Sequence, residues 1–266
     1  MANGRTLSIL AEQFLTEKVA RKELDPMSAR NRRSALRVFV AAVGDMPIRD
    51  LTTEHIGIWI EARADLAPAT RRAHWSALKT FLAWARASGH MKHDPLAGLP
   101  SPRQPRAVPR ALHASSVGKL LVICPDARGR AIVWLMVGMG LRCVEVSRAQ
   151  LGDWDRDRKL LTIRGKGSHE RVVPVPPRVA LAIREYLKEQ PSNAGPLIRS
   201  KRQPNSPLTP DTISGMVSEW MGAAKVKRLP RDGNSAHALR HTAASDVLDA
   251  CGDLRVVQEM LGHSQL

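Results

Sequence analysis

The sequence predicts a mainly α-helical chain of two domains, with a small β-sheet in the C-terminal one. Apolar residues recur at helical spacing throughout the N-terminal part, which predicts an all-α domain over 1–98. Four prolines in the twelve residues 99–110 resist helix and strand and predict an extended linker. Two alternating segments flank a glycine turn further on, which predicts a mixed α/β domain over 111–266. A chain of 266 residues is long enough for two such cores.

Four helices are expected in the N-terminal domain. The first spans about 7–24, the second starts near Ser28, the third is capped by Thr52 and the fourth is opened by Pro68. Residues 44–50 are expected to form a turn between the second and third helices. The third helix is expected to hold the apolar residues Ile56, Trp59 and Ile60.

The second and fourth helices carry basic residues on the side away from the core. A solvated helix face is the usual explanation for such charges, but the charge of the whole chain favours contact with the phosphates and grooves of a duplex. Arg103 and Arg106 extend this expectation into the linker, which could wrap a duplex between the two domains. The helical residues expected to bind DNA are Arg30, Arg32, Arg33, Arg71, Arg72, His74 and Lys79.

The C-terminal domain is expected to start with a helix at Ser115 or Ser116. An apolar run predicts a buried helix over 129–139, and G-L-R-C-V-E-V (140–146) predicts a turn that opens another helix. The remaining expected elements are a hairpin of strands at 159–164 and 171–175, a helix over 177–190, a short strand at 197–199 and a helix that starts at Thr209-Pro210-Asp211.

Charge restricts the partner. The chain has 41 Lys and Arg against 25 Asp and Glu, a net charge of +16. Residues 1–110 have 18 basic against 10 acidic residues and residues 111–266 have 23 against 15, so each part contributes +8. Both domains are therefore expected to meet a polyanion, nucleic acid before membrane. Only 4% of the residues are aromatic, which favours double-stranded DNA over RNA or single strands.

Cofactors and membrane segments are not expected. Cys124, Cys143 and Cys251 show no metal-ligand spacing, which indicates reduced thiols in a cytoplasmic protein. The longest apolar run, 131–139, is too short to span a bilayer, and no signal peptide is visible. The sequence predicts no metal, no cofactor and no membrane partner.

The stretch from Ser235 onward carries the clearest chemistry. Ser235 is a good N-cap for a helix that holds His237 and Arg240 three positions apart on one face. A second helix, capped by Asp253 and ended by Gly262, leaves His263 just past its end. Arginine is a planar double donor and histidine passes a proton near neutral pH, so these residue types suit a phosphate.

H-A-L-R-H (237–241) followed by L-G-H (261–263) resembles the C-terminal catalytic motif of the tyrosine recombinases, the phage integrase family. G-L-R-C-V-E (140–145) and R-G-K-G-S-H-E-R (164–171) resemble its upstream motifs, and the resemblance covers nearly the whole chain. It implies a helical core-binding domain followed by a tyrosine-recombinase catalytic domain. Glu145 matches the family's acid and is expected to support a basic neighbour, whereas His241 and His169 are interpreted as structural or surface residues. The catalytic residues implied by the resemblance are Arg142, Lys166, His237, Arg240 and His263.

The chemistry can also be argued from the residue types. Attack on a phosphodiester concentrates negative charge on the non-bridging oxygens, which Arg142 and Arg240 could each hold. Lys166 could protonate the departing 5′-oxygen. His237 could take the proton of the nucleophile, and His263 could donate to a phosphate oxygen.

The sequence departs from the family at the nucleophile. The family's tyrosine follows the last histidine closely, which here falls beyond Leu266. The sole tyrosine, Tyr186, lies far upstream and is interpreted as a packing residue. We expect a truncated form that binds DNA without cleaving it and stays monomeric. The full-length form is expected to exchange strands as a homotetramer on DNA through 3′-phosphotyrosyl intermediates, as the resemblance implies.

The first helix begins close to Met1, which indicates the simple two-domain integrase that recognises core-type sites only. The excess of 30 Arg over 11 Lys suggests a GC-rich genome, such as that of an actinobacterial phage. The expected function is integration or excision of phage DNA at attachment sites in the bacterial cytoplasm, with a directionality factor as an additional partner. Two alternatives stay open: a non-catalytic DNA-binding regulator with the same clamp, and a nuclease that uses His237 and His263 as an acid–base pair.

Overall fold

The computed structural model describes residues 5–103, 111–165, 170–203, 205–227 and 235–262. The chain forms two compact units, Met1–Ala107 and Val108–Leu266. The boundary falls inside the stretch 99–110, and each unit has a hydrophobic core of its own. No helix in the described ranges is both long enough and apolar enough to cross a membrane.

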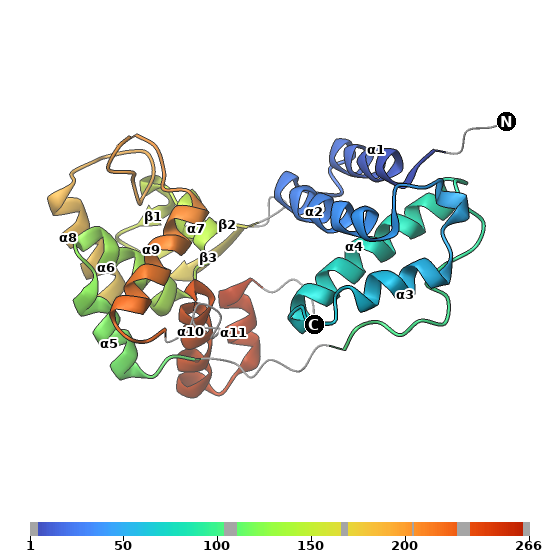
Figure 1. Ribbon diagram of the computed structural model, residues 1–266. Coiled ribbons are helices and arrows are strands. Elements are labelled where there is room, and N and C mark those ends of the chain that lie inside the picture. The colour runs from blue at the N-terminus through green and yellow to red at the C-terminus, as the bar shows by residue number, and fades with distance from the viewer. Residues whose placement is uncertain (1–4, 104–110, 166–169, 204, 228–234, 263–266) are drawn as a thin grey trace. The chain divides into compact units, whose positions relative to one another are not determined.

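The N-terminal unit is helical, as predicted (Figure 1). Asp25 caps its second helix by accepting a 3.0 Å hydrogen bond from the Ser28 backbone, and Pro26 occupies the first helical position. The first helix ends at Ala20, earlier than predicted, and a 3-10 turn closes the predicted 44–50 turn. The elements are α1 (Leu7–Ala20), α2 (Pro26–Val43), η1 (Ile48–Asp50), α3 (Thr53–Glu61) and α4 (Pro68–Ala87).

Aromatic rings fill the core of this unit. Phe14 packs against Phe81 with ring centroids 5.8 Å apart, and Phe39 meets Trp59 edge to face at 5.7 Å. Of the apolar residues that α3 holds, Ile56 and Trp59 are buried, whereas Ile60 is 39% exposed. Ile60 lies at the margin of the apolar stripe, about 100° around the helix from Trp59.

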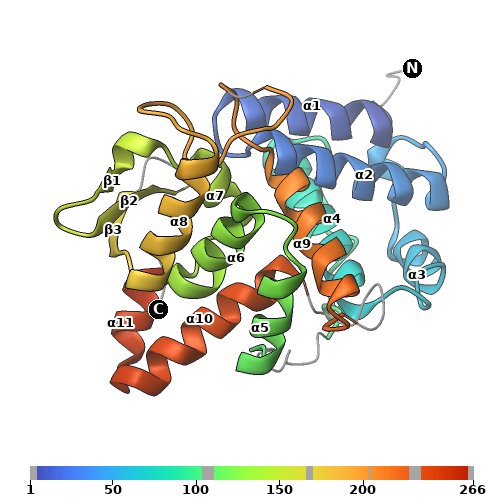
Figure 2. The same ribbon diagram turned by 90° about the vertical axis from the view of Figure 1, so that its left-hand side faces the viewer.

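The C-terminal unit packs several helices around one buried helix, and a small sheet lies at its edge (Figure 2). The predicted hairpin and helices are present, with helices both before and after the strands in the chain. The helices are α5 (Ala114–Ile123), α6 (Ala127–Met139), α7 (Cys143–Arg148), η2 (Leu151–Asp153), α8 (Pro177–Glu189), α9 (Pro210–Ala223), α10 (Ala236–Cys251) and α11 (Leu254–Leu261). The strands are β1 (Trp154–Asp155), β2 (Leu160–Arg164) and β3 (Glu170–Pro174).

Helix α6 is the centre of this core. Most of its residues are buried, and it packs against α8 and α10. Helices α6 and α8 are in close contact at Gly138 of α6. A Cβ added to Gly138 would lie only 2.6 Å from a methyl group of Val179 on α8. The C-terminal end of α6 is consequently held against α8 and α10, and Gly140 (φ +65°) turns the chain towards α7.

The three strands form an antiparallel sheet in the order β1-β2-β3. Leu161 pairs with Val173 at its buried face, and the register ends at the pair Arg164 and Glu170. The predicted hairpin is thus confirmed. Strand β1 was not predicted, since two residues are too few to show an alternating pattern.

Two boundaries differ from the prediction in this unit. Helix α5 begins at Ala114, because the His113 side chain caps it by accepting from the Ser115 backbone at 3.4 Å. The segment 197–199 is no strand: it has a single isolated bridge, which joins Arg199 to Pro207.

The helices that carry the C-terminal motif start and end where the sequence predicts. Ser235 caps α10 by accepting from the His237 backbone at 3.3 Å, and Asp253 caps α11 by accepting from Arg255 at 2.7 Å. Gly262 ends α11 in the left-handed conformation, with φ +64°.

Candidate functional site

Arg142 lies at the N-cap of α7 and is held by Glu145 one turn later. The Arg142 backbone donates to Glu145 Oε2 at 2.8 Å, and Arg142 Nη1 donates to Oε1 at 2.9 Å. The Arg142 side chain stays 36% exposed, whereas that of Glu145 is 2% exposed. This reciprocal cap leaves the guanidinium fixed but accessible.

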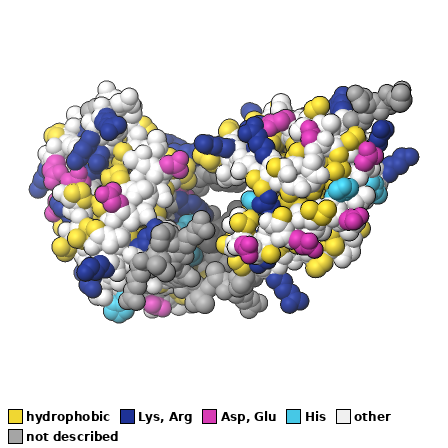
Figure 3. All heavy atoms as spheres, in the orientation of Figure 1, with side chains coloured by type: hydrophobic (Ala, Val, Ile, Leu, Met, Phe, Trp, Pro, Cys, Tyr) yellow, Lys and Arg dark blue, Asp and Glu magenta, His cyan; other side chains and the backbone are white. Residues whose placement is uncertain are grey.

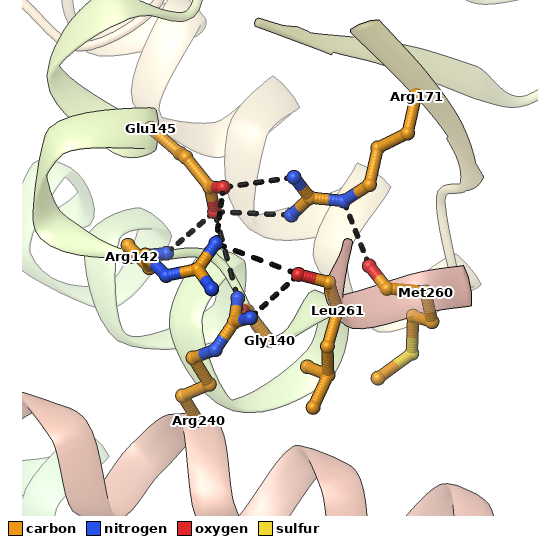
Figure 4. A network of polar contacts seen from close by, with 7 residues as sticks. All are labelled: Gly140, Arg142, Glu145, Arg171, Arg240, Met260 and Leu261. Carbon is orange, nitrogen blue, oxygen red and sulfur yellow. Dashed lines mark hydrogen bonds and ion pairs between the residues drawn. The ribbon is translucent and has the colours of Figure 1, made fainter. Parts of the chain in front are cut away.

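Arg240 reaches the same place from α10. It donates through Nη1 to the Gly140 carbonyl and through Nη2 to the Leu261 carbonyl, both at 2.5 Å, and Nη1 lies 3.6 Å from Glu145 Oε2 (Figure 4). Arg142 Nη1 also faces the Leu261 carbonyl, at 3.5 Å. Burial and then the charge of Arg142 lower the pKa of Arg240 to about 10, so it remains protonated at neutral pH. The two arginines predicted to converge do so.

A third guanidinium, that of Arg171 on β3, completes the cluster. Its two terminal nitrogens bind the Glu145 carboxylate at 2.8 and 3.0 Å, and its Nε donates to the Met260 carbonyl at 2.8 Å (Figure 4). Our sequence reasoning did not assign Arg171 a role. A usable signal existed, because alternation along the strand puts Arg171 on the same face as the buried Val173, and an inward arginine needs an acidic partner.

Glu145 therefore lies among three guanidiniums, as expected for a residue that supports basic neighbours. Burial alone would raise the pKa of Glu145, but hydrogen bonds and charge from Arg171 and Arg142 outweigh burial and hold it below its ordinary value. One carboxylate against three guanidiniums leaves an excess of two positive charges in a partly buried site. Such a site is suited to bind an anion.

His237 stands beside this cluster on the first turn of α10. The residue is exposed, and its ring meets that of His241 edge to face with centroids 5.4 Å apart. The pKa of His237 is below its ordinary value because its ring is partly desolvated and because His241, Arg240 and Arg142 lie close to it. His237 is thus largely neutral at pH 7 and able to accept a proton.

Several predicted residues lie outside the described ranges: Lys166, His263 and Arg106, together with His169. Two described residues near Lys166 and His263, namely Arg171 and Gly262, lie at the Glu145 cluster. Arg164 and Glu170, which bracket 165–169, are bonded to each other at 3.2 Å, and Arg171 follows directly. Gly262, which precedes His263, lies against Arg171, whose Nη1 would be 3.0 Å from a Cβ added there.

The basic residues predicted on α2 and α4 lie on the N-terminal unit, with different exposure. Arg30, Arg72, Lys79 and Arg103 are exposed, whereas Arg32, Arg33, Arg71 and His74 are half-buried. Arg32 donates to Thr80 at 3.1 Å, and Arg33 binds both carboxylate oxygens of Glu12 at 2.8 and 3.0 Å. Burial and the charge of Arg63 lower the pKa of His74. Lys and Arg side chains are spread over both units (Figure 3).

A metal site would need several His, Cys, Asp or Glu side chains grouped together. In the part of the chain that the structure describes, no three His, Cys, Asp or Glu residues are grouped to hold a metal ion. The cysteines are free thiols, and burial raises the pKa of Cys124 to about 12.

Comparison with known proteins identifies the family. The family model described as "Phage integrase family" matches residues 110–266. The chain belongs to the phage integrase family. It is 32% identical over 264 residues to tyrosine recombinase XerC of Shewanella amazonensis, a match that covers 96% of this chain and 87% of the relative. It is 30% identical over 268 residues to XerC of Xanthomonas campestris pv. campestris, covering 97% and 80%.

Solved structures share the fold. A lambda integrase (75-356) dimer bound to a COC' core site matches with a TM-score of 0.80 at 20% identity, covering 98% of this chain and 96% of the other. The integrase from mycobacterium phage Brujita matches with a TM-score of 0.51 at 26% identity, covering 96% and 84%. The mainly α architecture with a three-stranded sheet is thus that of the tyrosine recombinases.

The only tyrosine of this family member is unavailable for chemistry. Tyr186 on α8 is fully buried, at 0% exposure. Its hydroxyl accepts from the Arg199 backbone at 3.2 Å and faces Gln190 at 3.5 Å. The interpretation of Tyr186 as a packing residue is confirmed.

Proposed function

We propose that this chain binds a DNA duplex and activates one backbone phosphate for site-specific strand exchange. The observation that carries the proposal is the convergence of Arg142, Arg171 and Arg240 on Glu145, with His237 beside them. Three elements distant in sequence build one site with excess positive charge. Burying that much positive charge is costly unless an anion binds and neutralises it. Because the relatives are recombinases, we propose that this anion is a DNA phosphodiester.

In this proposal, Arg142 and Arg240 hold the non-bridging oxygens of the phosphate. A tyrosine oxygen attacks phosphorus, the bond to the 5′-oxygen breaks and a 3′-phosphotyrosyl bond forms. Neutral His237 takes the tyrosine proton, Lys166 gives a proton to the 5′-oxygen, and His263 donates to a phosphate oxygen. Loss of Arg142 is expected to slow cleavage by about 10²–10³, roughly 3–4 kcal/mol, if it acts like other oxyanion donors.

The attacking tyrosine is not Tyr186, because that side chain is buried. We therefore propose that these 266 residues bind DNA without cleaving it. A lambda integrase tetramer bound to a Holliday junction is among the structural neighbours. We propose the same stoichiometry for a form that includes the tyrosine, acting at attachment sites of phage DNA in the bacterial cytoplasm, with a directionality factor.

Further DNA contacts are proposed for the N-terminal unit. Arg30, Arg72, Lys79 and Arg103 are exposed and would meet phosphates directly. Arg32, Arg33, Arg71 and His74 are half-buried, so they would contact DNA only in part or through their free ends. Such contacts fix the register of the protein on the duplex.

A single experiment separates this function from its alternatives. The chain is extended at its C-terminus by a tyrosine-bearing segment and incubated with nicked duplexes that carry candidate core sites. A covalent protein–DNA adduct supports the recombinase, and the Arg142→Ala variant should form it about 10²–10³ times more slowly. Free cleaved ends would indicate a nuclease that uses His237 and His263. Binding with neither product would indicate a DNA-binding regulator, which the burial of Tyr186 favours for the chain alone.

A further inference from the structure

A second basic cavity lies in the C-terminal unit, beyond the far end of α6 from the Glu145 cluster. It has a volume of about 480 Å³ and is bounded by the loop that precedes α9 and by the first turns of that helix. The residues that line it include Arg128, Lys201, Arg202, Ser200, Thr209 and Thr212. Figure 2 shows this loop beside α7 and the start of α9.

Arg128 is the most informative of these residues. It is 8% exposed, and its Nη1 donates to the Arg199 carbonyl at 3.2 Å. Its Nε is buried and has no hydrogen-bond partner among the described residues. A buried guanidinium with an unused donor at the wall of a cavity is incomplete, because burying such a donor unpaired is unfavourable.

The charges around the cavity are unbalanced in the same direction. Lys201 binds Asp126 at 2.9 Å, and that carboxylate also caps α6 through Gly129. The net charge at the cavity is +2, because three basic residues face one acidic residue, Asp126. This equals the excess around Glu145. The three basic residues are Arg128, Lys201 and Arg202. Asp211 in the first turn of α9 is exposed and does not line the cavity.

Hydroxyl groups and a helix start complete the set of donors. Thr209 caps α9 by accepting from the Thr212 backbone at 3.1 Å, and the two hydroxyls are 2.8 Å apart. Ser200 accepts from the Arg202 and Gln203 backbones, so its own hydroxyl proton is available to a ligand. Basic side chains, hydroxyls and the positive end of a 14-residue helix together favour a phosphate.

The cavity is connected to the Glu145 cluster through α7. Ser147 in the last turn of α7 donates to the Leu208 carbonyl at 2.6 Å, and Leu208 lines the cavity. Arg142 precedes the same helix, so one short helix links the two basic sites. Arg128 and Gly140 lie at opposite ends of α6, so the two sites are separated by about the length of that helix.

We infer that the cavity lined by Arg128, Lys201, Arg202 and the start of α9 binds a phosphate group, which in the DNA complex is a backbone phosphate other than the one that is attacked. That the phosphate belongs to DNA rests on the proposed function. That the cavity binds a phosphate rests on the residues of the cavity itself. The site would anchor the duplex and so help to hold the attacked phosphate at Arg142.

The first measurement uses inorganic phosphate and the 266-residue chain, followed by amide NMR. Phosphate is expected to shift the amides of Gly129 and Thr212. Asp126→Asn keeps a helix-capping side chain and removes the competing charge, so it should tighten phosphate binding several-fold. A weaker or unchanged affinity in Asp126→Asn, or shifts only at the Arg142 end of α7, would contradict the site.

The second measurement uses a duplex and salt titration. The Lys201→Ala/Arg202→Ala variant should lose at least one phosphate contact, which lowers the slope of log K against log salt by about 0.9. The affinity ratio of parent to variant then shrinks about 3.5-fold between 50 and 200 mM salt. Arg184→Ala/Lys188→Ala on α8 removes the same charge from two exposed positions and is the matched control, expected to keep the parental slope.

The outcomes separate the two parts. Equal slope changes in variant and control would show a general charge effect and overturn the site. Phosphate shifts at Gly129 and Thr212 with an unchanged slope would show a site for free phosphate and overturn the duplex contact. If the parent does not bind duplex at all, the proposed function fails, and the phosphate titration alone decides whether the cavity is an anion site.

Discussion

The two units carry their positive charge in opposite ways. In the C-terminal unit, Arg240 is buried and the Arg171 side chain is only 14% exposed, and each is held by Glu145 and by one or two main-chain carbonyls. In the N-terminal unit, Arg30 and Arg72 are exposed on helices whose other face is an aromatic core. Arg33 is intermediate, with a half-exposed ion pair to Glu12.

The difference separates positioning from affinity. Charges that are desolvated and fixed by several hydrogen bonds interact strongly with one phosphate, but only in one geometry. Exposed charges on helix faces are screened and mobile, so each contributes little, yet many of them together attract any duplex. The fixed charges lie around Glu145, where the chemistry is proposed. The exposed charges lie on the helix faces of the N-terminal unit.

The largest expected effect concerns the exposed charges. If six to ten phosphates are contacted, duplex affinity should fall by about 10³–10⁵ between 50 and 200 mM salt, because bound counterions are released on association. Fluorescence anisotropy with a labelled duplex measures this. The Arg142→Met/Arg240→Met variant should retain most of the slope, since only two contacts are lost. A flat salt response would contradict the electrostatic account of the N-terminal unit.

The next effect concerns the buried charges. Glu145→Ala leaves three guanidiniums without their acid and is expected to lower the free energy of unfolding by about 3–5 kcal/mol. Urea unfolding measures it. Glu189→Ala, an exposed residue at the end of α8, is the control and should stay within about 0.5 kcal/mol. A loss for Glu145→Ala no larger than the control's would show that the cluster is not held by this carboxylate.

The same residue predicts a pH dependence. Since the pKa of Glu145 is lower in the folded chain, its stabilisation is complete above the ordinary value near 4.5 and is lost as pH falls through the folded value. The stability difference between the parent and Glu145→Gln should therefore narrow below about pH 4.5. A constant difference down to the acid transition would contradict the depressed pKa.

A smaller effect tests the link between His237 and the arginines. The pKa of His237 lies below the ordinary 6.5 in the folded chain, so the unfolded chain binds the proton first as pH falls. His237 therefore lowers the free energy of unfolding as pH falls from 6.5 through its folded pKa. Arg142→Met should raise this pKa in an NMR titration, and duplex binding should raise it in the parent, because a phosphate favours the charged ring. Arg184→Met on α8 should leave it unchanged. An unaltered pKa in Arg142→Met would separate His237 from the site.

The smallest effect is expected at the exposed pair. Arg33→Ala should change the free energy of unfolding by less than about 1 kcal/mol, since its bridge to Glu12 is half-exposed. A double-mutant cycle with Glu12→Ala isolates the pair. A coupling as large as that of Arg171 with Glu145 would remove the distinction between the two regions.

Local signals predicted most of the helices, and the exceptions are instructive. Ser235, Asp253 and Gly262 have side chains or backbone conformations that act within a few residues, so their capping roles are visible in the sequence. His113 is a rarer cap, and its helix was therefore predicted to start late. Of the site residues that the resemblance implied, Arg142, Arg240 and His237 lie together in the described part of the chain. Arg171, by contrast, required knowledge of what faces the strand.

By itself, the sequence determined the two-part helical architecture, the hairpin, the helix caps and the basic character, because each depends on neighbours in the chain or on composition. Only the tertiary structure decided that Arg171 shares Glu145 with Arg142 and Arg240, and that the buried Nε of Arg128 has no partner among the described residues. These facts depend on which side chains meet across distant segments. The energy of a buried charge is decided by those partners and by the exclusion of water, neither of which is encoded locally.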